Sequence, residues 1–264
     1  MIELESVYKS YPGSESYAVD NVSFTVERGE FLGLIGESGC GKTTTLKLIN
    51  RLVESNSGTI VVGGDDVQKR DPVELRRNIG YVFQGIGLFP HYSVEKNVAA
   101  VPDLLGWDTE RTQRRVCEML SLVGLAPDVY RHRRPSELSG GQQQRVGVAR
   151  ALVAEPEVVL MDEPFGALDP ITRAELQEEF GRIQRDLGLT VIMVTHDMTE
   201  VLLMADRIAV MKEGRILQIG TPRELLTEPA HDYVREIVEM PKRRADRLEE
   251  LMQRETQDDC GKNS

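Results

Sequence analysis

The chain has 264 residues, 40% of them hydrophobic and 28% charged, with a formal net charge of −11. This length can bury the core of one large domain or two small ones, and the acidic balance argues against nucleic acid as a partner, because duplex binding needs a broad basic face. No apolar run reaches the roughly 18 residues of a membrane span, and the start of the chain lacks a signal-peptide pattern. The three cysteines form no CxxC pair. We therefore expect a cytoplasmic protein.

The amino-terminal part of the chain predicts strands and two helices. Residues 1–35 include the alternating "NVSFTVERGE" and the buried run "EFLGLIG", and "GTIVVGG" is a later strand. A helix is expected over residues 42–52. In "DPVELRRNIGYVFQ", Asp71 caps a helix with Pro72 at its first position and Glu74 completing a capping box, and the strand "IGYVF" follows.

The rest of the chain first turns helical and then alternates strands with helices. Residues 85–154 carry apolar side chains at three- and four-residue spacing. The strands "EVVLMDEP", "TVIMVTHD", "RIAVM" and "RILQIG" follow, with one helix capped by Asp169 and another by Asp197 with Glu200. From Pro241 the chain is charge-dense, and we expect this tail to fray.

Strands that alternate with helices predict an α/β fold with a mainly parallel sheet and helices on its faces. The helical block of residues 85–154 is long enough to form a lobe of its own. We therefore expect an α/β core from residues 1–84 and 155–240 with the lobe inserted between them, and a charged tail at 241–264.

The segment "GESGCGKT" follows a buried strand, opens a helix and matches G-x-x-x-x-G-K-[ST]. Its glycines let backbone N–H groups turn toward phosphate oxygens, Lys42 supplies a charge for the β- and γ-phosphates of ATP, and the Thr43 hydroxyl suits Mg²⁺. The alternative, a glycine-rich turn that binds nothing, does not explain the strand–loop–helix context. The residues expected to line the nucleotide are Gly36, Glu37, Ser38, Gly39, Cys40, Gly41, Lys42, Thr43 and Thr44.

Two adjacent carboxylates, Asp162 and Glu163, end the buried strand "EVVLMDE". Ligands of open α/β sheets lie beyond the carboxyl ends of strands, so Asp162 can hold the Mg²⁺ shell. Glu163, on the opposite face of the strand, can act as general base on a water molecule. The alternative is a pair of solvated acids at a strand end.

Three further residues are weak signals when taken singly. His196 ends the strand "TVIMVTHD" and can fix the attacking water or contact the γ-phosphate. Gln84 ends "IGYVFQ" and can reach the metal or the water through its amide, and Tyr11 can stack on a purine ring. A structural histidine, a solvated glutamine and a surface aromatic are the alternatives.

The segment "LSGGQ" reads as the start of a helix with Ser139 as its cap and Gln142 as the capping-box partner. Gly140 and Gly141 then occupy the first two helical positions, where each costs up to about 1 kcal/mol relative to alanine. Bare N–H groups at this helix end suit an anion. The lobe separates this helix from the phosphate loop, so one ATP can meet both only if a second copy of the chain supplies the second, in a two-fold dimer.

The motifs together resemble the ATP-binding cassette ATPases of transporters over about residues 1–240: "KSYPG", "GESGCGKT", "VFQ", "LSGGQ", "VVLMDE", "GALD" and "VTHD", in the family's order. The resemblance implies a RecA-like core with an antiparallel amino-terminal β subdomain, and two cassettes that sandwich two ATP molecules. It implies that Glu163 is the base, that His196 is the switch and that Asp169 joins the two sites. Gly166 stands where many relatives have serine.

The stretch "GIGLFPHYSVEKNVAAVPDLLGW" is similar to cassettes of bacterial importers for glycine betaine, choline, carnitine and proline betaine. The resemblance implies permease subunits that dock near the Q-loop, an extracytoplasmic solute-binding protein and a peripheral place on the cytoplasmic face of the membrane. Only 24 residues follow position 240, so we expect no regulatory domain. The alternatives are an importer for another small solute such as an amino acid, a soluble cassette ATPase acting on DNA or ribosomes, and a P-loop kinase or GTPase.

Overall fold

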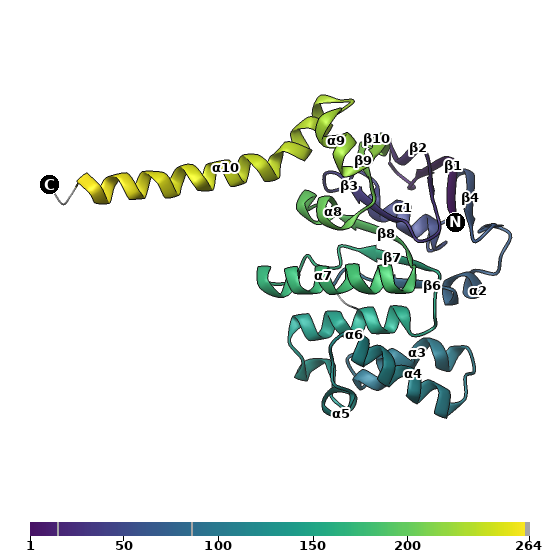
Figure 1. The fold of residues 1–264 in the computed structure, drawn as a ribbon. Coiled ribbons are helices and arrows are strands. Elements are labelled where there is room, and N and C mark those ends of the chain that lie inside the picture. Colours follow the sequence, from purple (N-terminus) through teal and green to yellow (C-terminus); the bar gives the residue numbers. More distant parts are fainter. Residues whose placement is uncertain (15, 86, 262–264) are drawn as a thin grey trace.

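Within the residues that the computed structural model describes, 1–14, 16–85 and 87–261, ten strands form two sheets (Figure 1). The first sheet is antiparallel, with strand order β2-β1-β4-β5. Its strands are β1 (Ile2–Ser10), β2 (Tyr17–Val26), β4 (Ser57–Val62) and β5 (Asp65–Asp66). The antiparallel amino-terminal subdomain implied by the family resemblance is therefore present.

The second sheet has the order β10-β9-β3-β8-β7-β6 and is parallel except for the β9–β10 pair. Every residue of β3, β7 and β8 is buried, as expected of parallel strands covered on both faces. The mainly parallel sheet is thus confirmed. Its strands are β3 (Phe31–Ile35), β6 (Ile79–Val82), β7 (Val158–Asp162), β8 (Thr190–Thr195), β9 (Arg207–Lys212) and β10 (Arg215–Gly220).

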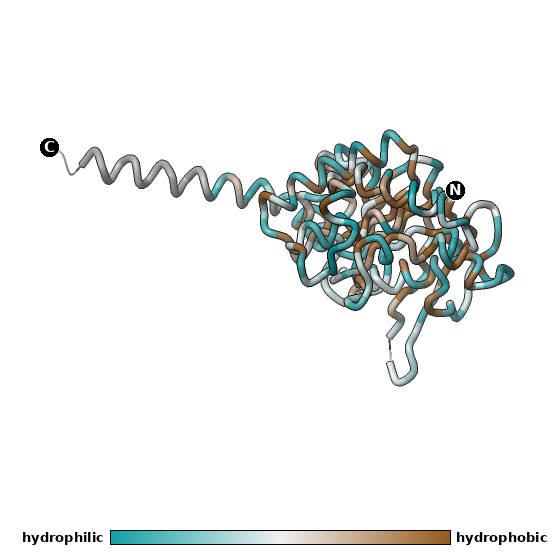
Figure 2. The backbone as a smooth tube through the Cα atoms, turned by 90° about the horizontal axis from the view of Figure 1, so that it is seen from below, coloured by the Kyte–Doolittle hydropathy of each residue, from teal (hydrophilic) through white to brown (hydrophobic). Residues whose placement is uncertain are grey.

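The two faces of this sheet belong to two separate hydrophobic cores. Along β7, Val158 and Leu160 pack with the antiparallel sheet, whereas Val159 and Met161 pack with the core shared with the helical lobe. In Figure 2 the hydrophobic stretches of the backbone, in brown, gather within the body of the molecule. Helices α1 (Lys42–Ile49), α2 (Pro72–Arg77), α7 (Pro170–Leu187), α8 (Met198–Met204) and α9 (Pro222–Thr227) accompany the sheets.

A separate group of helices lies at the end of the molecule away from the antiparallel sheet (Figure 1). It contains α3 (Val94–Leu104), α4 (Thr109–Leu122), α5 (Pro127–Tyr130), the 3₁₀ turn η1 (Pro135–Glu137) and α6 (Gly140–Leu152). Helix α6 joins this lobe to the sheet so closely that a Cβ atom at Gly80 would lie 2.6 Å from the carbonyl oxygen of Ala151.

Most of the expected helix caps are present, and two details differ. Asp71 accepts hydrogen bonds from the amides of Val73 and Glu74, but the Glu74 side chain pairs with Arg70 at 3.8 Å instead of completing a capping box. Helix α1 ends at Ile49 rather than near Leu52, because Arg51 adopts a left-handed conformation with φ of 48°.

The largest difference from expectation concerns the carboxyl-terminal tail. Helix α10 (Asp232–Gly261) does not fray at Pro241 but continues through it and projects away from the body (Figure 1). Residues 242–261 include four arginines, three glutamates and two leucines, which are strong helix formers. Arg243 also forms an ion pair with Glu239 one turn earlier, at 2.7 Å.

Candidate functional site

The loop between β3 and α1 depends on glycines for steric reasons. Gly41 has φ of 107°, and a Cβ atom there would lie 2.1 Å from the carbonyl oxygen of Ala18. Gly36 has φ of 157°, and its Cβ would lie 2.1 Å from the carbonyl oxygen of Met211. Other side chains cannot occupy these positions without displacing the backbone that packs behind the loop. The conformation of the loop therefore requires both residues.

Lys42, the first residue of α1, lies inside the curve of this loop with 5% of its surface exposed. Its ammonium group donates hydrogen bonds to the carbonyl oxygens of Gly36 at 2.7 Å and Glu37 at 2.9 Å. The lysine charge is thus held at the centre of the loop by the backbone, and the loop presents a compact cation beside the amino terminus of α1. This combination suits a phosphate group.

The end of β7 meets the start of α1 through one short contact. The Thr43 hydroxyl donates to Oδ1 of Asp162 at 2.8 Å. Burial raises the pKa of Asp162, and the charge of Glu163 raises it further, while the Thr43 hydrogen bond opposes both. A hard cation would relieve this unfavourable burial of charge.

The donor set around Thr43 and Asp162 fits Mg²⁺ rather than a metal held by protein ligands alone. Within the described part of the chain, no group of three or more His, Cys, Asp or Glu side chains could hold a metal ion. Mg²⁺ is commonly bound through one or two carboxylates together with phosphate oxygens of a substrate. The hydroxyl of Thr43 and the buried carboxylate of Asp162 are ligands of this kind.

Glu163 lies where three loops meet. Its Oε2 accepts a hydrogen bond from Nε2 of Gln84 at 3.2 Å and lies 3.4 Å from Nδ1 of His196. We expected Glu163 to continue the alternation of the strand, but β7 ends at Asp162 and Glu163 has φ of 45°, so the alternation does not extend to it. The amide of Glu163 donates to the carbonyl oxygen of Val194 at 2.9 Å, which holds this strained conformation.

Tyr11 lies beside the same loop. Its hydroxyl is 3.4 Å from Oγ1 of Thr44, and the side chain is partly exposed at 40%. The ammonium group of Lys9 lies 5.3 Å from the centre of the ring. The ring thus stands next to the start of α1 with surface free to stack on a planar group.

The residues of "LSGGQ" lie on the helical lobe, beside α7 rather than beside the phosphate loop. Ser139 and Gln142 form the expected capping box, in which the Gln142 amide donates to the serine hydroxyl at 3.3 Å and the Ser139 amide donates to the glutamine side chain at 3.0 Å. A Cβ at Gly141 would lie 2.4 Å from Cγ2 of Thr172. Among the described residues, no hydrogen bond or ion pair joins these residues to residues 36–44.

Asp169 caps α7 close to this helix start. Its side chain accepts a hydrogen bond from the amide of Thr172 at 3.1 Å, and its hydrogen bonds to Thr172 lower its pKa. The structure therefore brings the predicted D-loop residue and the predicted signature residues to one edge of the chain, and the remaining predicted site residues to another.

Tyr233 is a residue near the loop that the sequence did not predict. Its hydroxyl accepts a hydrogen bond from the amide of Glu37 at 3.2 Å, and its ring lies 4.6 Å from the ammonium group of Lys212. Burial raises the pKa of this tyrosine. Tyr233 lies in "HDYVREIVEM", a helical pattern without any sign of contact with residue 37, so no signal in the sequence could have revealed it.

The sheet, the phosphate-binding loop and the carboxylates at the strand ends define an α/β protein of the class that binds nucleoside triphosphates. No helix in the described ranges is both long and apolar enough to pass through a bilayer. The profile of the ABC transporter family matches residues 19–166, which is more than half of the chain. The chain belongs to the ABC transporter family.

Similar proteins agree with this assignment. The glycine betaine/carnitine/choline transport ATP-binding protein OpuCA of Bacillus subtilis (strain 168) is 54% identical over 238 residues, which are 90% of this chain and 62% of that protein. The glycine betaine uptake system ATP-binding protein YehX of Escherichia coli (strain K12) is 50% identical over 236 residues, 89% of this chain and 76% of that protein.

Among solved structures, the dimeric post-hydrolysis state of the ATP-binding cassette MJ0796 bound to ADP and Pi matches with a TM-score of 0.76 and 33% identity. The match covers 84% of this chain and 99% of that one. The fold is therefore that of an ATP-binding cassette. The chain spans about 62% of the length of relatives such as OpuCA, and the expectation that no regulatory domain follows it stays a prediction.

Proposed function

We propose that this chain is the ATP-hydrolysing subunit of an importer for a small quaternary amine such as glycine betaine, choline or carnitine. The observation that carries the proposal is the meeting of Gln84, Glu163 and His196, from three distant motifs, next to the Thr43–Asp162 contact. The solute class is supported by what the names of OpuCA and YehX say of those proteins. The fold and the domain boundaries given above are compatible with it.

In this proposal the loop of residues 36–44 holds the phosphates of ATP, with Lys42 at its centre and Tyr11 stacked on the adenine ring. Thr43 and Asp162 would hold Mg²⁺, with Gln84 close by. When bound, the ion neutralises charge on the β- and γ-phosphate oxygens. The carbonyl oxygens that now accept from Lys42 keep its ammonium group inside the loop, so a phosphate meets a charge that is already in place.

Glu163 takes the proton of the attacking water in this proposal. Oε2 of Glu163 accepts a hydrogen bond from Gln84 on one side and lies near His196 on the other. The loops that carry these two residues therefore orient the carboxylate. The left-handed backbone at Glu163 turns the side chain away from the strand pattern and toward these loops. His196 is mostly exposed, at 64%, and is free to contact the γ-phosphate region.

The second half of each site comes from another copy of the chain. Ser139 and Gly140 are exposed at the helix start that Gly141 and Gln142 continue, and among the described residues no hydrogen bond or ion pair joins this start to residues 36–44 of the same chain. In a head-to-tail dimer they would face the γ-phosphate held by the other copy, and Asp169 would lie at the joint between the two sites. The dimeric state in the description of MJ0796 supports this arrangement.

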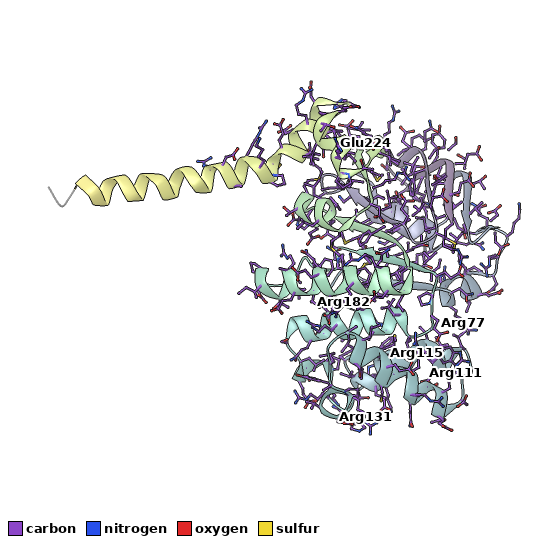
Figure 3. All side chains as sticks on the ribbon, in the orientation of Figure 1. Arg77, Arg111, Arg115, Arg131, Arg182 and Glu224 are labelled. Atoms are coloured by element: carbon purple, nitrogen blue, oxygen red, sulfur yellow. The ribbon has the colours of Figure 1, made fainter. Side chains whose placement is uncertain are left out.

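The permease is proposed to dock on a groove between the sheet and the helical lobe, next to Gln84. The cavity there has a volume of about 210 Å³. Phe83 lines it with 43% of its surface exposed, and Arg77, the last residue of α2, which is labelled in Figure 3, lines it as well. A groove lined by exposed apolar and basic side chains suits a short helix of a membrane subunit. The chain would then work peripherally, at the cytoplasmic face of the membrane.

The substitution E163Q tests the catalytic part of the proposal. The amide keeps the size of the side chain but cannot accept the proton of water, so Mg-ATP should still bind while hydrolysis falls at least about a hundredfold. The variant should form a dimer with Mg-ATP, measured by light scattering, and the wild-type chain with ADP is the matched control. A variant that stays monomeric with saturating Mg-ATP would contradict the sandwich arrangement.

Uptake in cells tests the solute class. In cells that contain the intact transport system, replacement of the chain by its K42A variant should abolish uptake of labelled glycine betaine, choline or carnitine, because the lysine charge in the loop is lost. Uptake of a labelled amino acid serves as the control. Loss of amino-acid uptake with betaine uptake intact would favour an amino-acid importer instead.

A further inference from the structure

A buried carboxylate lies behind the strand end that carries His196, and the proposed reaction makes no use of it. Glu200, in the first turn of α8, is 3% exposed. Its Oε2 accepts a hydrogen bond from the Thr195 hydroxyl at 2.6 Å, and its Oε1 accepts one from Nε2 of Gln177 at 3.1 Å. The sequence predicted a capping role for Glu200, whereas Asp197 alone caps α8 by accepting from the amide of Thr199.

The contact with Thr195 fixes the turn from which His196 projects. Besides donating to Glu200, the Thr195 hydroxyl accepts a hydrogen bond from the amide of Asp197 at 3.0 Å. His196 is therefore bracketed by two residues that are tied to each other and, through Thr195, to Glu200. Its imidazole is mostly exposed and lies 3.4 Å from Glu163, so the backbone at 195–197 is what determines where the ring stands.

The contact with Gln177 ties the same turn to α7, the helix that begins directly after the D-loop segment "GALD". A second tie lies one turn earlier on α7, where Arg173 donates to the carbonyl oxygen of Leu168 at 3.1 Å and lies 3.6 Å from Oδ2 of Asp197. Arg173 and Gln177 are four residues apart and so share one face of the helix. Both ties run from the D-loop side to the residues on either side of His196.

Burying the carboxylate of Glu200 in this hydrogen-bond network costs folding free energy, which argues that the carboxylate has a specific role. A buried carboxylate is unfavourable unless it is fully hydrogen-bonded, and burial together with the charge of Asp197 raises the pKa of Glu200. An apolar side chain would fill the same space without that penalty. What an apolar side chain cannot do is join Thr195 to Gln177 in a fixed geometry.

We propose that Glu200 and Gln177 are positioning residues that link the seating of the D-loop to the position of His196. In a dimer, contact of the second copy with residues 166–169 fixes α7, and the Gln177–Glu200–Thr195 chain then holds the His196 ring at its distance from Glu163. The inference rests on the proposed function and adds to it the route by which dimer contact reaches the site. It assigns neither residue a contact with substrate.

The test measures kcat and KM for ATP in the variants E200A, Q177A and E200Q, with the melting temperature recorded for each. E200A and Q177A should lower kcat about tenfold and leave KM within about twofold, since the loop of residues 36–44 is untouched. E200Q should retain most of the activity. The new side-chain amide can accept a hydrogen bond from Thr195 through its oxygen, and it can donate one to Gln177 once the Gln177 amide has flipped. E178A, an exposed change one residue from Gln177, is the matched control and should behave as wild type.

Two further measurements separate positioning from simple loss of structure. In an E163Q background, E200A should still dimerise with Mg-ATP, because the interface residues are intact. The double variant Q177A/E200A should be no slower than E200A, since both substitutions break one chain of contacts. If E200A does not fold, Q177A, at a partly exposed position, decides the question.

Equal kcat in Q177A and E178A, or effects of Q177A and E200A that multiply in the double variant, would overturn the inference. So would parallel losses of kcat and KM that follow the melting temperature. A wild-type chain without ATPase activity would instead refute the proposed function, so the two failures are distinguishable.

Discussion

The two glycine-containing helix starts of this chain are built in opposite ways. At the start of α1, Gly41 has a positive φ that only glycine adopts readily, lies against Ala18 and belongs to a loop whose carbonyl groups already hold Lys42. At the start of α6, Gly140 is exposed, and the nearest atom to a Cβ there would be Leu168 Cδ2 at 4.0 Å. The glycine at the first helix start is required by contacts within the chain, although that start has no side-chain cap, whereas the second start is capped by Ser139 and Gln142 and has room for a side chain at position 140.

Glycine therefore serves different purposes at the two helix starts. At position 41 it satisfies packing within the chain, and at position 140 it leaves space for a group from outside the chain. In the loop, glycine is required by the fold. On the lobe, Gly141 packs against Thr172, but the fold would accept a side chain at position 140, so we attribute the glycine at 140 to what approaches from outside. The predictions below test this contrast.

The largest effect is expected from G41A compared with G140A. In G41A the new Cβ meets the Ala18 carbonyl at 2.1 Å, so the variant should lose about 2–4 kcal/mol of unfolding free energy and most of its ATP affinity. G140A should melt at or above the wild-type temperature and bind ATP normally as a monomer, yet hydrolyse it slowly. Calorimetric melting and nucleotide titration check both. Similar destabilisation in the two variants would remove the contrast.

The next prediction concerns S139R, in which a long side chain covers the exposed helix start. Hydrolysis should fall about a hundredfold, since the donors proposed to face the γ-phosphate are blocked, while ATP binding to the monomer stays unchanged. Steady-state ATPase assays and nucleotide titration give the two quantities.

Mixing provides the control for this variant. S139R and K42A are each inactive, but their mixed dimer contains one site with an intact loop and an intact facing helix. An equal mixture should therefore recover about a quarter of the wild-type activity. No recovery on mixing, with mixed dimers shown to be present, would mean that the helix start acts within its own chain.

A smaller effect is expected from D162N, which tests the loop side alone. The raised pKa of Asp162 means that the folded chain binds its proton more tightly than the unfolded chain, so this carboxylate costs stability as the pH rises above the ordinary aspartate value of 3.8. Without nucleotide, D162N should therefore gain stability relative to wild type as the pH rises from 3.8 toward neutrality. Melting temperatures at several pH values measure the difference, and S139A is the matched control, since its difference from wild type should not vary in this way.

The sequence predicted what local rules decide. The phosphate-loop motif, the caps at Asp71 and Ser139, and the buried parallel strands all follow from a few neighbouring residues. Contacts that depend on packing between distant segments were not predictable. Tyr233 and Glu37 are 196 residues apart, and no periodicity in either segment points to the other.

Two other differences have the same origin in tertiary structure. Glu163 leaves the strand pattern because its amide is held by a neighbouring strand, at Val194. Glu200 looks like a capping residue because of its spacing from Asp197, but the packing of α7 against α8 turns it inward, to Gln177. A reading of single segments could place these residues on the right elements and still miss their partners.

The smallest effect is expected from Y233F, which removes one hydroxyl from the ring that contacts the loop. The Glu37 amide would lose its acceptor, which costs about 1 kcal/mol of unfolding free energy, whereas the ring keeps its contact with Lys212. Because this bond fixes the outer side of the loop, KM for ATP should rise modestly while kcat changes little. Y130F, which removes a hydroxyl from the helical lobe where it accepts from Gln142, is the matched control and should leave KM unchanged. An equal rise of KM in both variants would show that the lobe and the loop are not separate units for nucleotide binding, and the contrast between the two helix starts would then lose its basis.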